Sequence, residues 1–154
     1  MSFDIGTSAV AVISVVLTGL IAGQMLAMAL ANHAARSLPE TSWTLRFQAE
    51  NKLFTKTMPA SLLLPLFGLI WLAFLTVSAQ RGMFSAAAAL ELIVLAITIS
   101  IEIPINRQVA SWTAGSAPST WMGIRDRWLR FHWLRTAVAA CSFACGAIGL
   151  RIHV

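Results

Sequence analysis

A short stripe of charged and aromatic residues, near the start of the last apolar stretch, is the strongest candidate for chemistry. It consists of Arg125, Trp128, His132 and Arg135. Spacings of three, four and three place these side chains on one face of a helix. An imidazole titrates at about pH 6.5, so His132 is suited to proton transfer at neutral pH. The alternatives are a structural hydrogen bond from His132 and an Arg135 that reaches lipid headgroups.

Two acids stand in the preceding apolar stretch. Glu91 and Glu102 are eleven residues apart, or about three helical turns, and therefore share one face of a helix. Ionisable groups in a membrane are costly and usually face the interior of a bundle. For Glu102 we expect either an ion pair with Arg125 or Arg135, which would join the two helices, or direct chemistry. We expect Glu91 to be a structural acid, protonated or hydrogen-bonded.

Further polar residues occur in the first half of the chain, at the same expected depth as Glu102 and His132. They are Gln24, Asn32, His33, Gln48, Glu50 and Asn51. A polar cluster drawn from several helices at one level is typical of a binding pocket, although these residues are also simply the ends of helices. His33, Glu50, Glu102 and His132 are potential metal ligands. Because the sequence has no Glu-x-x-His, His-x-x-x-His or Cys-x-x-Cys pattern, we expect no metal.

The elements that position these residues are membrane-spanning helices. Hydrophobic residues make up 58% of the 154 residues and charged residues 11%, against about 25% charged in a soluble domain. Four apolar stretches, at about 8–31, 58–79, 83–105 and 133–150, have the roughly 20 residues that cross a bilayer. Spanning segments must satisfy their own backbone hydrogen bonds, so we predict an all-α four-helix bundle, built as one transmembrane domain over 1–154.

The connections between these spans are unequal. Residues 41–56 contain good helix formers with apolar residues at intervals, which predicts an amphipathic helix before the second span. Gln80, Arg81 and Gly82 predict a tight turn between the second and third spans. Residues 106–118 are predicted to form a loop. Pro118 is predicted to open a helix that continues unbroken into the fourth span.

Lysine and arginine set the expected orientation. The first connection carries four of them and the third carries five, which makes nine, whereas the second connection and the C-terminal tail carry one each. Basic connections face the cytoplasm, so both termini are expected on the non-cytoplasmic side of the inner cell membrane. Contact with anionic lipid accounts for the net charge of +5 without a nucleic-acid partner. Gly19 and Gly23 form a G-x-x-x-G pattern, which favours a contact within the bundle, with a homo-oligomer as the alternative.

The segments "IEIPINRQVASW" and "IRDRWLRFHWLRTAVA" resemble the anthrone oxygenase-like family of small four-span membrane proteins. The residues that match the family pattern are Pro104, Asn106, Trp128, His132, Arg135 and Thr136, with Gln48 and Asn51 ahead of the second span. Many members have an asparagine where this chain has Glu102. A carboxylate at that position is a stronger base and is able to bind a cation.

The resemblance implies a membrane enzyme that oxygenates an apolar, anthrone-like phenol to a quinone with no metal or flavin. Under this hypothesis His132 or Glu102 is the base, and Arg135, Asn106 and Asn51 stabilise the oxyanion. The expected substrate-binding residues are Gln48, Asn51, Asn106, Trp112, Trp128 and Phe131. Two other functions remain open: a non-enzymatic protein of transport, lipid binding or assembly, and a metal-dependent membrane oxidoreductase.

Overall fold

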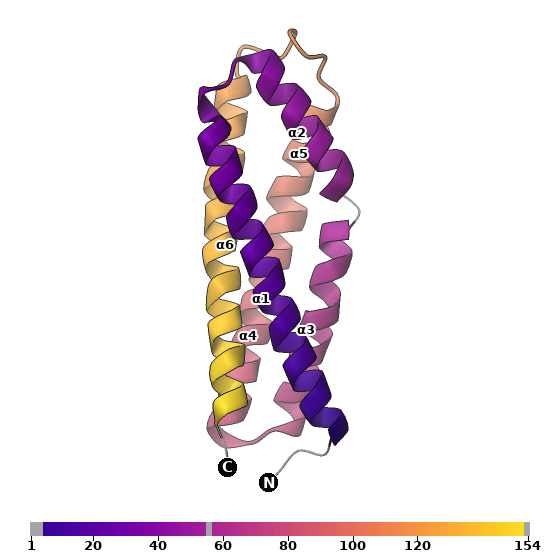
Figure 1. The fold of residues 1–154 in the computed structure, drawn as a ribbon, viewed down its shortest axis with the longest axis vertical. Coiled ribbons are helices and arrows are strands. Elements are labelled where there is room, and N and C mark those ends of the chain that lie inside the picture. The colour runs from indigo at the N-terminus through magenta and orange to yellow at the C-terminus, as the bar shows by residue number, and fades with distance from the viewer. Residues whose placement is uncertain (1–4, 55–56, 153–154) are drawn as a thin grey trace.

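The computed structural model describes residues 5–54 and 57–152, and these form an all-α bundle, as predicted. The elements are α1 (Ile5–Ala34), a 3-10 turn (Ala35–Ser37), α2 (Glu40–Phe54), α3 (Thr57–Leu75), α4 (Ser78–Ile97), a π turn η2 (Thr98–Glu102), α5 (Ile103–Ala110) and α6 (Trp121–Arg151). Four long rods lie along the long axis, and α2 runs obliquely beside one end of them (Figure 1). We call this the α2 end. The chain enters α1 and leaves α6 at the opposite end.

Four helices are long and apolar enough to cross a membrane. They extend over Ile5–Ser37, Thr57–Leu75, Ser78–Ala110 and Trp121–Arg151. Large apolar side chains on their outer surfaces are exposed, among them Leu20, Phe67 and Phe74. Such surfaces are stable in lipid rather than in water, so this is a multi-pass membrane protein. The four expected spans are confirmed, and three of them belong to longer helices than the apolar stretches indicated.

The interior away from the α2 end is closely packed and mainly apolar. Leu69 and Leu72 of α3 and Phe84 of α4 are completely buried there. Gly19 brings α1 close to α6, because a Cβ atom at that position would lie 2.8 Å from the Phe143 ring. The contact predicted for Gly19 is therefore present, whereas a Cβ on Gly23 would meet no atom within 4 Å.

The turn between α3 and α4 lies earlier than predicted. It falls at Thr76 and Val77, and Gln80, Arg81 and Gly82 belong to α4. The Thr76 hydroxyl donates to the Leu72 carbonyl at 2.7 Å, and the Thr76 carbonyl accepts from Arg81 Nε at 2.7 Å. These bonds close α3 and open α4. The glycine was misleading because the chain turns by placing Ser78 at a positive φ of 53° instead.

The helix of the third span does not stop at Pro104. Proline has no N–H to donate to the carbonyl four residues earlier, so the chain forms a π turn immediately before it, in which the Ile103 N–H bonds to the Thr98 carbonyl. The helix then resumes and reaches Ala110. The predicted loop over 106–118 is therefore wrong for its first five residues, which are helical, and the connection occupies 111–120.

An aromatic cluster holds α2 against the rest of the α2 end. Trp43 stacks on Phe47 at 4.9 Å between ring centroids, and it also meets Trp112 at 6.4 Å and Trp121 at 5.7 Å. The predicted amphipathic helix is confirmed as α2, although 55–56 lie outside the described residues. The prediction of an unbroken helix into the fourth span is confirmed as well, but α6 begins at Trp121 and not at Pro118.

Candidate functional site

A buried cluster of an acid, a histidine and an arginine joins the π turn to α6. Glu102 Oε2 accepts from Arg135 Nη1 at 2.7 Å, and Glu102 Oε1 lies 3.0 Å from His132 Nδ1. The exposed fractions are 2% for Glu102, 1% for His132 and 5% for Arg135. The ion pair expected for Glu102 is therefore present, with Arg135 as its partner, and the acid also faces the histidine.

Two further groups fix the geometry of this cluster. Thr98, on the same π turn as Glu102, accepts from Arg135 Nη1 at 2.9 Å. The carbonyl of Met25 in α1 lies 3.0 Å from His132 Nε2. Arg135 Nη2 lies 3.0 Å from His132 Nδ1, so both terminal nitrogens of the arginine are engaged. Three helical segments thus hold one histidine ring in place.

The contacts decide which ring nitrogen carries a proton. A carbonyl only accepts, so the bond to Met25 requires a proton on His132 Nε2. His132 Nδ1 then faces both an acceptor, Glu102 Oε1, and a donor, Arg135 Nη2. If His132 is neutral, Nδ1 accepts from the arginine. If it is protonated, Nδ1 donates to the glutamate. The cluster therefore has one place for an additional proton, between Glu102 and His132.

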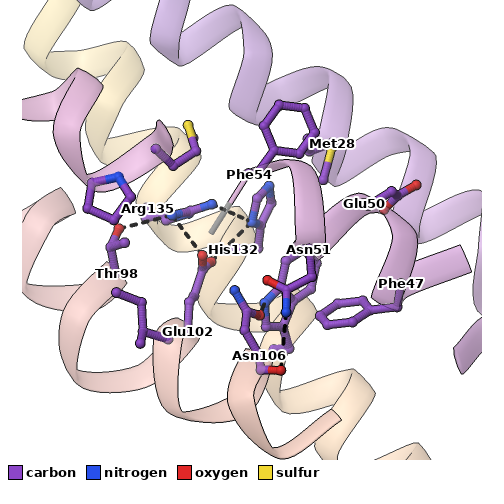
Figure 2. Close-up of a pocket in the computed structure, with 14 residues that line it drawn as sticks. Met28, Phe47, Glu50, Asn51, Phe54, Thr98, Glu102, Asn106, His132 and Arg135 are labelled. Atoms are coloured by element: carbon purple, nitrogen blue, oxygen red, sulfur yellow. Dashed lines mark hydrogen bonds and ion pairs between the residues drawn. The ribbon is translucent and has the colours of Figure 1, made fainter. Parts of the chain in front are cut away.

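This cluster forms one wall of a pocket at the α2 end (Figure 2). The cavity volume is small, about 50 Å³ against the roughly 300–1,000 Å³ of typical small-molecule sites, so a larger ligand would extend into the open mouth of the pocket. Its lining comes from all four long rods and α2: Met28, Phe47, Glu50, Asn51, Phe54, Met58, Pro59, Thr98, Glu102, Ile103, Asn106, Trp128, His132 and Arg135. The exposed lining is mainly apolar, with Thr98, Glu102, His132 and Arg135 close together and Glu50 beside Met28 and Phe47 (Figure 2).

An aromatic ring and two amides continue the polar side of the pocket. The Trp128 indole stacks on the His132 imidazole, with centroids 4.5 Å apart and planes at 20°. Trp128 Nε1 donates to Asn106 Oδ1 at 2.9 Å, and Asn51 Nδ2 donates to the Asn106 carbonyl at 3.2 Å. Because an indole N–H only donates, the side-chain oxygen of Asn106 must face Trp128, and its NH₂ group faces elsewhere.

Three residues expected to bind substrate do not line this pocket. Gln48 Nε2 donates to the carbonyls of Val109 and Trp112, both at 2.9 Å, and so ties α2 to the end of α5. Trp112 belongs to the aromatic cluster around Trp43. Phe131 is next to His132 in sequence and is therefore turned about 100° away from it around α6. The spacing of residues in the sequence did not distinguish Gln48, Trp112 and Phe131 from the residues that line the pocket.

Among the four candidate metal ligands, Glu102 and His132 are in contact, whereas Glu50 and His33 have other surroundings. Glu50 lines the pocket but pairs with Arg46 at 2.6 Å and accepts from Asn32 at 3.3 Å. His33 is exposed on a different surface, between α1 and α6. In the described part of the chain, no three His, Cys, Asp or Glu side chains are close enough to hold a metal ion. Glu91 is buried within the bundle, 1% exposed, where the Ser142 hydroxyl donates to the Ala87 carbonyl.

Sequence reasoning missed several residues of the site. Thr98 precedes Glu102 by four positions, and this spacing could have identified it. Phe47 was expected on the apolar face of α2, and it meets the Trp128 ring edge-on at 5.1 Å. The Met25 carbonyl had no sequence signal, because a backbone atom of another helix enters the site only through the fold.

Comparison with known proteins places this geometry in a family. The family described as "Anthrone oxygenase" matches residues 43–145, which is two thirds of the chain. The chain belongs to this family. The anthrone oxygenase match begins in α2 and includes Glu102, His132, Arg135, Asn106 and Trp128, but it leaves out α1 and therefore Met25. No curated protein and no solved structure matches the chain.

Proposed function

We propose that this protein is a membrane-embedded oxygenase that converts an apolar, anthrone-like substrate to a quinone without a resident cofactor. The observation that carries the proposal is the buried cluster of Glu102, His132 and Arg135, which opens on a mainly apolar pocket. The α2 end, where this pocket lies, faces the cytoplasm in the proposed orientation, since it carries most of the basic residues.

Proton removal is the first step that the cluster supports. An anthrone carries acidic hydrogens on the ring carbon opposite its carbonyl, and loss of one gives an electron-rich enolate. Glu102 receives this proton and shares it with His132 Nδ1, which is the one vacant proton position in the cluster. His132 Nε2 is committed to the Met25 carbonyl, so we assign Glu102 as the base and His132 as its proton partner.

We assign Arg135 a different role from the one expected from the sequence. Both of its terminal nitrogens contact Glu102, Thr98 or His132, so they hold the cluster rather than a substrate oxygen. We assign the enolate oxygen to the side-chain NH₂ of Asn106, which Trp128 orients by its bond to Asn106 Oδ1. Preorganised donors of this kind stabilise negative charge as it develops.

The remaining steps take place between the substrate and dioxygen. The enolate passes one electron to dioxygen, and the resulting radical and superoxide combine at the deprotonated carbon to give, after protonation, a hydroperoxide. Loss of water, with the second hydrogen of that carbon, leaves the quinone. One oxygen atom of dioxygen enters the product and the other leaves as water, and no external reductant is consumed.

The apolar walls favour a flat aromatic substrate that arrives from the membrane. Phe47 and Phe54 of α2 and Met28 of α1 supply apolar surface to this pocket (Figure 2). Aromatic and thioether side chains make favourable contacts with ring faces and edges. We therefore propose that the ring inserts between these side chains and presents its acidic carbon to Glu102.

The test is anthrone turnover by the protein reconstituted in lipid nanodiscs and treated with a chelator. Dioxygen uptake and quinone absorbance are followed together. We expect one dioxygen consumed per quinone, and a loss of at least about 100-fold in the double variant Glu102→Gln, His132→Ala. Glu40→Gln, an acid of α2 outside the pocket, is the matched control and retains the wild-type rate.

Three results would contradict the proposal. The first is turnover by the double variant at the wild-type rate. The second is the absence of wild-type turnover above that of empty nanodiscs. The third is loss of wild-type activity on chelation, which would support a metal-dependent oxidoreductase. Gel filtration of each variant, with the single variant Glu102→Gln alongside, separates loss of chemistry from loss of fold.

A further inference from the structure

Two hollows on the outer surface of the bundle, between α1 and α6, share one residue. Trp133 lines both of them. The first hollow, which we call the basic pocket, lies at the α2 end and is lined by His33, Arg36, Asp126 and Arg130 among others. Its composition differs from that of the catalytic pocket, with which it has no lining residue in common.

The second hollow, which we call the glycine groove, is almost entirely apolar. Its lining includes Gly19 and Gly23 of α1 and Ala137, Ala140 and Phe143 of α6. A Cβ atom on Gly23 would meet nothing within 4 Å, so the groove is open at this point rather than filled by a neighbouring helix. Of the two glycines in the G-x-x-x-G pattern, Gly19 thus makes a helix contact, whereas Gly23 borders open space.

The two hollows form a continuous track along α6. Asp126, Arg130, Trp133, Ala137 and Ala140 follow one another at intervals of four, three, four and three, which keeps them on one face. The track therefore changes from charged to apolar at a tryptophan, and tryptophan is enriched at the boundary between headgroups and hydrocarbon. Phe143 follows Trp133 by ten positions, a rise of about 15 Å, which is the depth of one leaflet of hydrocarbon.

The charge of the basic pocket is positive. It contains three basic side chains and one acid, and that acid, Asp126, already pairs with Arg36 at 3.2 Å and with Arg125 at 3.0 Å. Within residues 5–54 and 57–152, no hydrogen bond or ion pair is found for His33 or Arg130. An anion bound next to Arg36 and Arg130 would balance the excess positive charge of the basic pocket.

We propose that this face binds one anionic phospholipid, with its phosphate at Arg36 and Arg130 and one acyl chain in the glycine groove. A second copy of the chain fits less well. Two identical faces packed side by side in a membrane bring like residues together at the same depth, so the basic pockets would face each other. A phospholipid supplies the opposite charge and the apolar chain in the order that the track requires.

The test is native mass spectrometry of the detergent-solubilised protein, titrated with phosphatidylglycerol or with phosphatidylcholine of the same acyl chains. We expect one phosphatidylglycerol molecule bound in preference to phosphatidylcholine. An arginine near headgroups is worth about 1 kcal/mol, or about five-fold in affinity, so Arg36→Gln, Arg130→Gln should lower phosphatidylglycerol binding roughly 20-fold. The matched control, Lys52→Gln, Arg107→Gln, removes two exposed cations elsewhere at the α2 end and should bind like wild type.

The groove is tested separately by Gly23→Leu, because a Cβ atom at this position meets nothing within 4 Å and the side chain would occupy the groove. We expect it to weaken both lipids, whereas Gly82→Leu, at another glycine with no atom within 4 Å, should not. The proposal is overturned if the two double variants bind phosphatidylglycerol equally, or if Gly23→Leu leaves binding unchanged. It is also overturned if Gly23→Leu converts a dimer to a monomer, since the groove would then be an interface between copies.

Discussion

Glu102 and Arg135 form an ion pair at 2.7 Å that crosses from the π turn to α6 with both side chains almost completely buried. Each charge is tolerated there only because the other is present, since burying an unpaired charge is costly. The pair therefore places a carboxylate against a histidine at a depth where an isolated carboxylate would be unstable. The proposed base depends on this arrangement.

Removing the arginine should damage the fold more than removing both partners. Arg135→Met leaves Glu102 buried without its partner, and we expect a loss of about 3–5 kcal/mol in the free energy of unfolding. The double variant Arg135→Met, Glu102→Gln should recover part of this loss. The measurement is unfolding by SDS titration in mixed micelles. A loss in the double variant equal to the sum of the two single losses would show that the pair is not coupled.

Gln48 should contribute to stability and not to substrate binding. Its side-chain amide satisfies the carbonyls of Val109 and Trp112, so Gln48→Ala should lower the free energy of unfolding by about 1–3 kcal/mol. The KM of the folded protein should not change. Gln108→Ala, an exposed glutamine on α5, is the control and should alter neither quantity. A raised KM with unchanged stability would instead support Gln48 as a substrate-binding residue.

Trp128 should act in two separable ways. Trp128→Phe keeps a ring against His132 but loses the donor to Asn106, so we expect kcat to fall about ten-fold with little change in KM. Trp128→Ala also removes the stack and should lower stability. Steady-state kinetics and SDS titration distinguish the two effects, with Trp71→Phe, on the exposed surface of α3, as the control. Equal kcat for Trp128→Phe and wild type would show that the Asn106 amide is not oriented by the indole.

The orientation in the membrane is a prediction from the distribution of basic residues. Alkaline phosphatase, which is active only outside the cytoplasm, should be active when it is fused after residue 154 and inactive when it is fused within 111–120. Green fluorescent protein at the same positions should give the opposite pattern. A phosphatase active in the 111–120 connection would reverse the assignment and place the pocket at the outer face.

The bundle could be predicted from the sequence because each span is recognisable from its own apolar composition. The stripe of Arg125, Trp128, His132 and Arg135 was predicted to lie on one face of a helix, and all four are buried. Such periodicity is local, so a single sequence reveals it. The expected ion pair of Glu102 with Arg125 or Arg135 is present, with Arg135, because two opposite charges in neighbouring spans have few other partners.

The errors have a different origin. The turn after the second span was placed at Gly82, but hydrogen bonds of Thr76 and a positive φ at Ser78 made the turn earlier. The first five residues of the loop predicted over 106–118 are helical because the π turn accommodates Pro104. The roles of Gln48 and Trp112 depend on where α2 lies against α5, and that placement results from tertiary packing that no local pattern encodes.

The central claim, that the Glu102–His132 pair takes the substrate proton, can be tested without the oxygen step. Anthrone is titrated into the nanodisc-bound protein under anaerobic conditions, and the absorption of its enolate is recorded. We predict that wild type and the control Glu40→Gln generate bound enolate, and that Glu102→Gln binds anthrone without ionising it. Equal enolate formation in Glu102→Gln and wild type, with both folded, would contradict the account.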